Sequence, residues 1–202
     1  MLFSSVNAAQ PELVLNYDGF FDRLDDLNEP EYADVTLGFF FKQVKNGEPC
    51  HIKSARLQSQ TDSMKVYFLG SGEVLLPFDE QLDMDKAKLI IEKSDDVDCG
   101  LNMQLQTKTL FKEKVSLEKA NKLITTFDLA LDELAGMMSF LTPDVNGITF
   151  IGDGQVPLSI KNNFDSLCSD AGCTLSRNQL DKFKGMIEFN YAPVKAIPYI
   201  EK

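Results

Sequence analysis

The stretch Ser116–Leu141, SLEKANKLITTFDLALDELAGMMSFL, decides the fold that we predict for this chain of 202 residues. Apolar side chains recur at steps of three and four along it, and the stripe consists of Leu117, Ala120, Ile124, Phe127, Leu131, Leu134, Met138 and Leu141. This spacing predicts one long amphipathic helix whose apolar face packs into a core. Ser116 is suited to cap its first turn. Thr142-Pro143 should end it, because proline lacks a backbone N–H and disfavours helical geometry in the residue before it.

The chain before this helix shows strand patterns. Apolar side chains alternate over 35–41, and Phe40 on the polar side predicts a strand that is covered on both faces. Asn46-Gly47 favours a hairpin turn, with a return strand over 50–58. Farther on, we expect Leu101, Met103 and Leu105 to point inward from a strand. Repeated short strands with polar turns are typical of an antiparallel sandwich.

The chain after the helix alternates between short strands and turns. Strands are predicted over 147–151 and 156–160, separated by the turn Gly152-Asp153-Gly154. Ser176 and Gln179 have the spacing of a capping box, which predicts a short helix. The last extended piece is flanked by Pro193 and Pro198, so we expect an edge strand or an unpaired tail.

These patterns predict an α+β protein. Residues 10–110 form an antiparallel, β-sandwich-like half, and residues 111–202 form a half built on the long helix, a few strands and a short disulfide loop. The helix is too apolar to stand alone, so we expect both halves to pack as one unit.

The composition restricts the partners that this chain can bind. It carries 31 acidic and 20 basic residues, a net charge of −11. Such a surface repels nucleic acids and anionic lipids. The apolar runs are far too short for a membrane span. An unknown protein or small molecule remains as the expected partner.

The first nine residues resemble the remnant of a secretory signal peptide. Leu2 and Phe3 look like the end of an apolar segment, and Val6-Asn7-Ala8 has the small-residue spacing that signal peptidase reads. The basic region and a full apolar segment are missing, so an ordinary unstructured N-terminus is the alternative. We expect a periplasmic protein whose sequence starts close to the cleavage site.

The four cysteines agree with export. Cys50, Cys99, Cys168 and Cys173 allow three connectivities. We predict Cys50–Cys99 and Cys168–Cys173, because each pair then lies within one half of the chain. Zinc is the rival explanation, but neither pair shows the close C-x-x-C spacing of structural zinc sites.

No pattern in the sequence marks a catalytic residue or a cofactor. His51, the single histidine, is expected to be a half-exposed strand residue. The aspartate clusters at 22–26, 83–85 and 95–98 are expected to be solvated turns. A calcium site from Asp79, Glu80, Asp83 and Asp85 is a weaker possibility. Met137-Met138 are interpreted as packing residues, with a partner-binding surface as the alternative.

The chain also resembles a known family. The segment Gly72–Asp79 (GEVLLPFD), Cys50, Cys99 before an alternating strand, and the closing 192–200 carry the resemblance. They are similar to small exported proteins of marine Gram-negative bacteria, a domain of unknown function family of the 2987 type. The resemblance implies a periplasmic location and supplies no catalytic residues.

The expected function is therefore a non-enzymatic binding or protein-interaction module in the periplasm. The alternative is a hydrolase that uses paired carboxylates. A deep cleft with two converging acidic residues of raised pKa would favour the enzyme. An exposed apolar patch without such a cleft would favour the binding protein.

Overall fold

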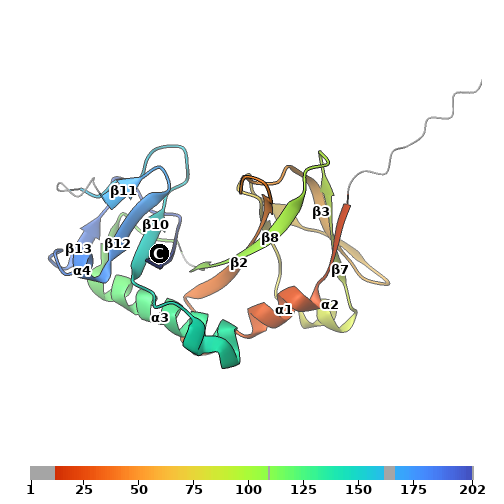
Figure 1. The fold of residues 1–202 in the computed structure, drawn as a ribbon, viewed down its shortest axis with the longest axis horizontal. Helices are drawn as coiled ribbons and strands as arrows, with labels where there is room; N and C mark the ends of the chain where they lie inside the picture. The colour runs from red at the N-terminus through yellow and green to blue at the C-terminus, as the bar shows by residue number, and fades with distance from the viewer. Residues whose placement is uncertain (1–11, 109, 162–166, 202) are drawn as a thin grey trace, which may run out of the picture. The chain divides into compact units, whose positions relative to one another are not determined.

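The computed structural model describes residues 12–108, 110–161 and 167–201 (Figure 1). The chain divides into two compact units, each with its own sheets. Of the described residues, the first unit comprises those from Glu12 to Asp22 and the segment Gly38–Met103, and the second comprises Arg23–Leu37 and those from Gln104 onward. The mixture of antiparallel strands and helices confirms the predicted α+β class.

The first unit contains a sheet with the strand order β1-β7-β3-β4. Its strands are β1 (Glu12–Asn16), β7 (Lys88–Lys93), β3 (Ile52–Gln58) and β4 (Ser63–Lys65). All three pairings are antiparallel. One face of the sheet carries Leu57, Leu89 and Ile91, which are all almost fully buried. These side chains form one wall of the core.

The second sheet of this unit has the order β5-β6-β2-β8. Its strands are β5 (Tyr67–Phe68), β6 (Glu73–Leu75), β2 (Val35–Gln43) and β8 (Cys99–Thr107), and β2 and β8 both continue into the second unit. Phe39, Phe40 and Phe41 are all buried, which confirms that β2 is covered on both faces. Phe20, from helix α1 (Asp18–Asp25), packs edge-on against Phe39.

The connection between β2 and β3 differs from the predicted hairpin. Gly47 does turn the chain, with φ +74°. The two strands share only an isolated bridge, Lys42 to Pro49, and β3 then pairs with β7 and β4 in the other sheet. The Cys50–Cys99 disulfide forms where the chain leaves one sheet for the other, and joins that point to the start of β8.

Two further predictions for the first unit are wrong. Leu101 and Met103 are exposed, because β8 is the last strand of its sheet; Leu105 is buried as expected. The cluster at 83–85, expected to be a solvated turn, lies at the end of helix α2 (Glu80–Met84), which forms because the Asp79 carboxylate accepts hydrogen bonds from the backbone N–H groups of Gln81 and Leu82. This capping satisfies the donors at the helix start.

The second unit is built around a sheet with the order β11-β12-β10-β14. Its strands are β11 (Cys168–Ser169), β12 (Gly172–Ser176), β10 (Gly147–Ile151) and β14 (Lys195–Tyr199). A two-stranded ladder joins β9 (Lys114–Ser116) to β13 (Met186–Glu188), and the short helices η1 (Pro30–Tyr32) and α4 (Arg177–Leu180) complete the unit. The Cys168–Cys173 disulfide links paired residues of β11 and β12, so both predicted disulfides are confirmed.

Helix α3 (Leu117–Ala135) packs against β10 in this unit (Figure 1). Its residues Ala120, Ile124 and Phe127 are completely buried, as the periodicity predicts. The helix ends earlier than predicted, however, because Gly136 adopts φ +55° and leaves the helical region. A 3-10 segment, η2 (Gly136–Leu141), follows and ends before Thr142. The C-terminal third of the stripe is therefore not part of the core.

Of the other predictions for this unit, two are confirmed and one is wrong. The capping box at α4 is confirmed, since Ser176 N donates to Gln179 Oε1 at 2.8 Å. Strand β14 lies at the edge of the sheet, also as predicted. Residues 156–160 form no strand; they contribute one isolated bridge, from Ile160 to Phe189.

Replacing Ser116 by alanine should lower the free energy of unfolding by about 1 kcal/mol, because its hydroxyl caps α3. The oxygen accepts a hydrogen bond of 3.1 Å from Lys119 N. Urea denaturation of the variant measures the loss. Ser116→Asp is the control: it keeps an acceptor at this position and should retain most of the stability. Equal losses in both variants would contradict the capping role.

Candidate functional site

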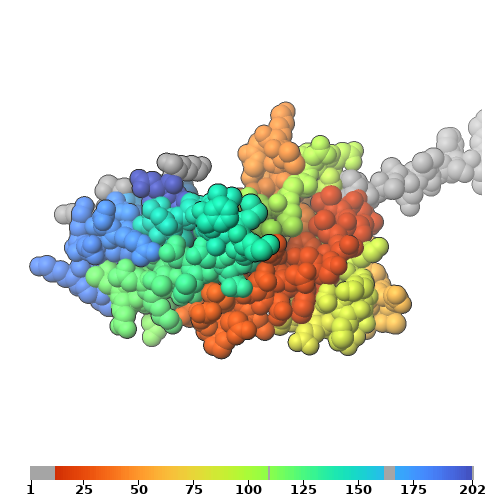
Figure 2. Space-filling view, turned by 60° about the horizontal axis from the view of Figure 1, so that its bottom comes forward, coloured from red at the N-terminus to blue at the C-terminus, as the bar shows by residue number. Residues whose placement is uncertain are grey.

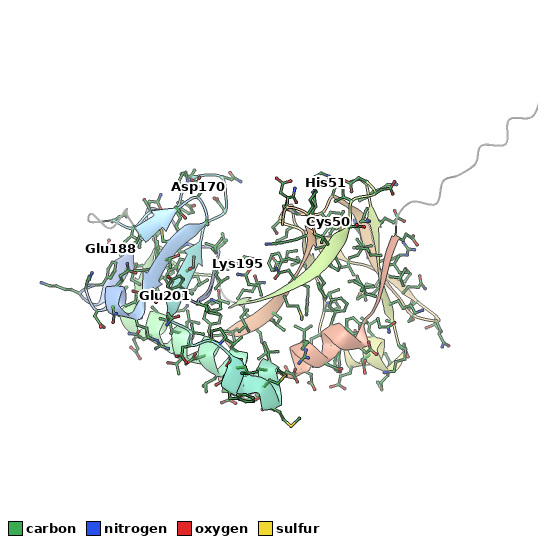
Figure 3. The ribbon with its side chains drawn as sticks, in the orientation of Figure 1. Cys50, His51, Asp170, Glu188, Lys195 and Glu201 are labelled. Carbon is green, nitrogen blue, oxygen red and sulfur yellow. A yellow bond between two sulfur atoms is a disulfide. The ribbon has the colours of Figure 1, made fainter. Side chains whose placement is uncertain are left out.

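His51 takes part in a surface pair rather than a nucleophilic site. It lies just before β3 with 68% of its side chain exposed, and its Nδ1 is 2.8 Å from Asp95 Oδ2. The nearby Ser94 hydroxyl donates to the backbone oxygen of His51, not to the ring, and Cys50 is in a disulfide (Figure 3). Because nucleophilic catalysis needs the base beside the nucleophile, this arrangement offers no activated serine or thiol.

Three of the four carboxylates in the stretch considered for calcium, those of Asp79, Asp83 and Asp85, already have partners. Asp79 caps α2, Asp85 accepts from the Gln81 amide at 2.8 Å, and Asp83 lies 3.6 Å from Lys86 Nζ. In the described parts of the chain, no group of three or more His, Cys, Asp or Glu residues converges as metal ligands. The aspartates at 22–26 and 95–98 likewise form no such group.

Two pockets of the second unit are each lined by one carboxylate among the described residues. A pocket of about 280 Å³ is lined by Asp170 and Tyr191, and another of about 390 Å³ is lined by Glu201. Figure 3 shows Asp170, Glu188 and Glu201 well apart from one another. The Lys114 ammonium, hydrogen-bonded at 2.8 Å, lowers the pKa of the Glu188 carboxyl. A lowered pKa keeps a carboxylate ionised, whereas a general acid needs a raised one.

Tyr191 closes the first of these pockets. Its hydroxyl donates to the Val156 backbone oxygen, and burial raises its pKa, helped by the negative charge of Asp153. A Cβ atom at Gly152 would collide with this hydroxyl, so the glycine gives the ring its space. Tyr191 therefore acts as a neutral structural residue that anchors the turn at 152–156. Its partnership with Val156 spans distant parts of the sequence, and no local pattern indicates it.

A lysine-lined pocket is a second feature that the sequence pattern did not indicate. Lys112, Lys114 and Lys119 surround a volume of about 290 Å³ near Phe111. The Lys119 ammonium lies 4.8 Å from the centre of the Phe111 ring, a cation–π contact. Lys114 pairs with Glu188. The Lys114–Glu188 pair crosses the ladder between β9 and β13 and therefore stabilises it.

The most distinctive surface feature is an apolar segment at the end of α3, which we name the ledge and define as residues 137–141. Met137 is 97% exposed and Phe140 is 79% exposed, and Met138 and Leu141 are also exposed. Figure 2 shows the teal part of the chain that includes this segment at the surface. The packing interpretation of Met137-Met138 is therefore wrong. A contiguous exposed apolar segment is typical of an interaction site.

The helix end beside the ledge is acidic. Asp132 and Glu133 occupy the last turn of α3, which contains no basic residue. This turn is the negative end of the helix dipole, where acidic side chains are unfavourable. The Asp132 carboxylate accepts a hydrogen bond of 2.7 Å from the Thr142 hydroxyl, just beyond the ledge. The apolar side chains of the ledge therefore lie next to a helix end with excess negative charge.

Comparison with known proteins places the chain in a family. Residues 9–151 match the family described as protein of unknown function (DUF2987), and the chain belongs to that family. No curated protein and no solved structure matches the chain. None of the described helices has the length and apolar character needed to cross a membrane. The two disulfides indicate a non-cytoplasmic protein, since such bonds persist in oxidising compartments.

Proposed function

We propose that this member of the DUF2987 family is a periplasmic, non-enzymatic protein-interaction module that binds its partner at the ledge. The exposed ledge is the observation that carries the proposal. Four large apolar side chains within five residues are exposed there, beyond a helix whose apolar face is buried from Ala120 to Ala130. Methionine side chains adapt to irregular partner surfaces, which suits an interaction site.

Export to the periplasm is supported by two independent features. The disulfides Cys50–Cys99 and Cys168–Cys173 suit an oxidising compartment. The small-residue spacing at Val6-Asn7-Ala8 suits cleavage by signal peptidase. Together these features favour the periplasm over the cytoplasm as the place where the ledge meets its partner.

The paired-carboxylate hydrolase receives no support from the pockets described above. Among the described residues, one of these two pockets is lined by a single carboxylate, that of Asp170, and the other by that of Glu201. Glycoside hydrolysis requires two carboxyl groups across one cleft. The pKa of Glu188 is also shifted in the direction opposite to that of a general acid.

Site-specific crosslinking in cells of the source bacterium tests the proposal. A photoreactive amino acid at Met138 should give one discrete adduct in the periplasmic fraction. The same group at Val44, which is 71% exposed in the first unit, should give none. Adding Phe140→Ser to the Met138 variant should abolish the adduct, because it replaces a large exposed apolar side chain of the ledge by a small polar one. Equal adducts at both positions, or a cytoplasmic location, would overturn the proposal.

A further inference from the structure

We infer that the partner segment that docks on the ledge is a cationic amphipathic helix, with large apolar side chains on one face and Lys or Arg beside them. This inference rests on the proposed function and adds the chemistry of the partner. The ledge supplies the apolar half of the match, through Met137, Met138, Phe140 and Leu141. The carboxylates around it supply the other half.

The first group of carboxylates lies at the end of α3 itself. Asp132 and Glu133 add negative charge where the helix dipole is already negative. Among the described residues, Arg23 reaches this end: it donates to the Leu134 backbone oxygen at 3.4 Å and pairs with Asp26 at 3.1 Å. A single guanidinium shared with Asp26 leaves a net negative charge. Basic side chains of a partner would be attracted to it.

A second group gathers around Tyr32 in the same unit. Burial raises the pKa of the Tyr32 hydroxyl, and the negative charges of Glu31, Glu133 and Glu29 raise it further. Helix η1 contacts α3, so the carboxylates of Glu29 and Glu31 at η1 lie in the same region as that of Glu133 on α3. Their charges reinforce those at the helix end.

The sequence itself supplies almost no compensating charge here. Residues 123–160 contain five acidic residues and no Lys, Arg or His. Residues 24–41 also contain five acidic residues and no Lys, Arg or His. Arg177 approaches Asp128 at 3.8 Å, and Lys122 pairs with Asp34 at 3.0 Å. Both ion pairs involve α3 residues that precede its last turn, Asp128 and Lys122. Further positive charge at the ledge end of α3 would therefore come from a partner.

The dimensions of the ledge suit a helix. Six residues of η2 span about 12 Å, because a 3-10 helix rises about 2 Å per residue. That length corresponds to roughly two turns of an α-helix, whose pitch is about 5.4 Å. A partner helix would therefore meet the ledge with apolar residues at i, i+3 or i+4, and i+7.

Charge also argues against other occupants. A second copy of this chain would bring a net charge of −11 against an equal charge, and an anionic membrane would be repelled in the same way. A cationic partner is instead attracted over a distance, which raises its association rate. The partner is therefore expected to carry both apolar and basic side chains.

Titration with synthetic helical peptides tests the inference on the full oxidised protein. The probe is a fluorescent Leu/Lys peptide with leucines at helical spacing. Comparison peptides replace every Lys by Glu, or every Leu by Ser. Only the Leu/Lys peptide should bind well, and its affinity should fall as salt rises. Amide chemical-shift changes should be confined to 25–34 and 129–144.

Matched variants separate docking from general attraction to an acidic protein. Phe140→Ser should weaken binding about tenfold, the loss typical of an anchoring apolar residue, whereas Val44→Ser should not. Glu133→Lys should weaken binding more than Asp96→Lys, which makes the same charge change at an exposed site in the first unit. Circular dichroism confirms that each variant is folded.

Several results would overturn the inference. Equal effects of Glu133→Lys and Asp96→Lys would show that attraction is nonspecific. Tight binding of the Leu/Glu peptide would show that the ledge does not select a cationic partner. Self-association of the protein alone, abolished by Phe140→Ser, would make a second copy the occupant. A Met138 crosslink that persists despite any of these results keeps the proposed function and rejects only this partner chemistry.

Discussion

Replacing Phe127 by alanine should lower the free energy of unfolding of the second unit by about 3–5 kcal/mol, one of the largest losses expected for a single substitution here. The ring is fully buried, with Ile124 and Ala130 also fully buried on the same helix. Truncation removes the transfer free energy of the ring and leaves a cavity between α3 and the sheet. A domain has only about 5–15 kcal/mol of stability in total, so this loss is severe.

The measurement is urea denaturation, combined with hydrogen exchange of the β10 amides to report on the second unit alone. Asn121→Ala is the control, an exposed position on the same helix, and should cost under about 0.5 kcal/mol. Asp128 is less suitable, although it lies on the polar side of the stripe, because its carboxylate accepts a hydrogen bond of 2.9 Å from Val145 N. Similar losses for Phe127→Ala and Asn121→Ala would contradict the core role of α3.

The core of α3 could be predicted from sequence because burial and periodicity have the same cause. Residues at steps of three and four fall on one face of a helix, and that face is buried from Ala120 to Ala130. The C-terminal part of the stripe was predicted wrongly, since the same spacing continues through Met138 and Leu141. Gly136 interrupts the helix there with a positive φ, and the spacing of apolar residues alone does not report it.

Strand positions were easier to predict than strand partners. The alternation over 35–41 and the Asn46-Gly47 turn are local signals, and both appear in the structure. The pairing of β3 with β7 instead of β2 depends on contacts between residues far apart in the chain. A turn signal gives the place of a reversal, but not the sheet that the returning strand joins.

The features of the candidate surface depend on such distant contacts as well. Glu29 and Glu31 approach Glu133 across about a hundred positions of sequence, so charge patterning along the chain gave no sign of them. The exposure of the ledge likewise depends on which neighbours cover it. The cysteine pairing was predictable because an even count with one pair in each half left a simple choice.

Replacing both Cys50 and Cys99 by alanine should destabilise the first unit by about 4 kcal/mol, because the disulfide closes a loop with a sequence separation of 49. Removing Cys168 and Cys173 should cost about 2 kcal/mol in the second unit, since the chain-entropy model gives a smaller effect for their separation of 5. Intact mass measurement of the oxidised wild-type protein should find no free thiols.

Hydrogen exchange resolves the two losses, because each disulfide lies within one unit. Loss of Cys50–Cys99 should lower the protection of β3 and β7, the strands that follow the crossing between the sheets. Loss of Cys168–Cys173 should act on β12 and β10. Wild-type protein in strong reductant should reproduce both changes at once. If the short-loop variant were the less stable of the two, loop length would not govern the stabilisation.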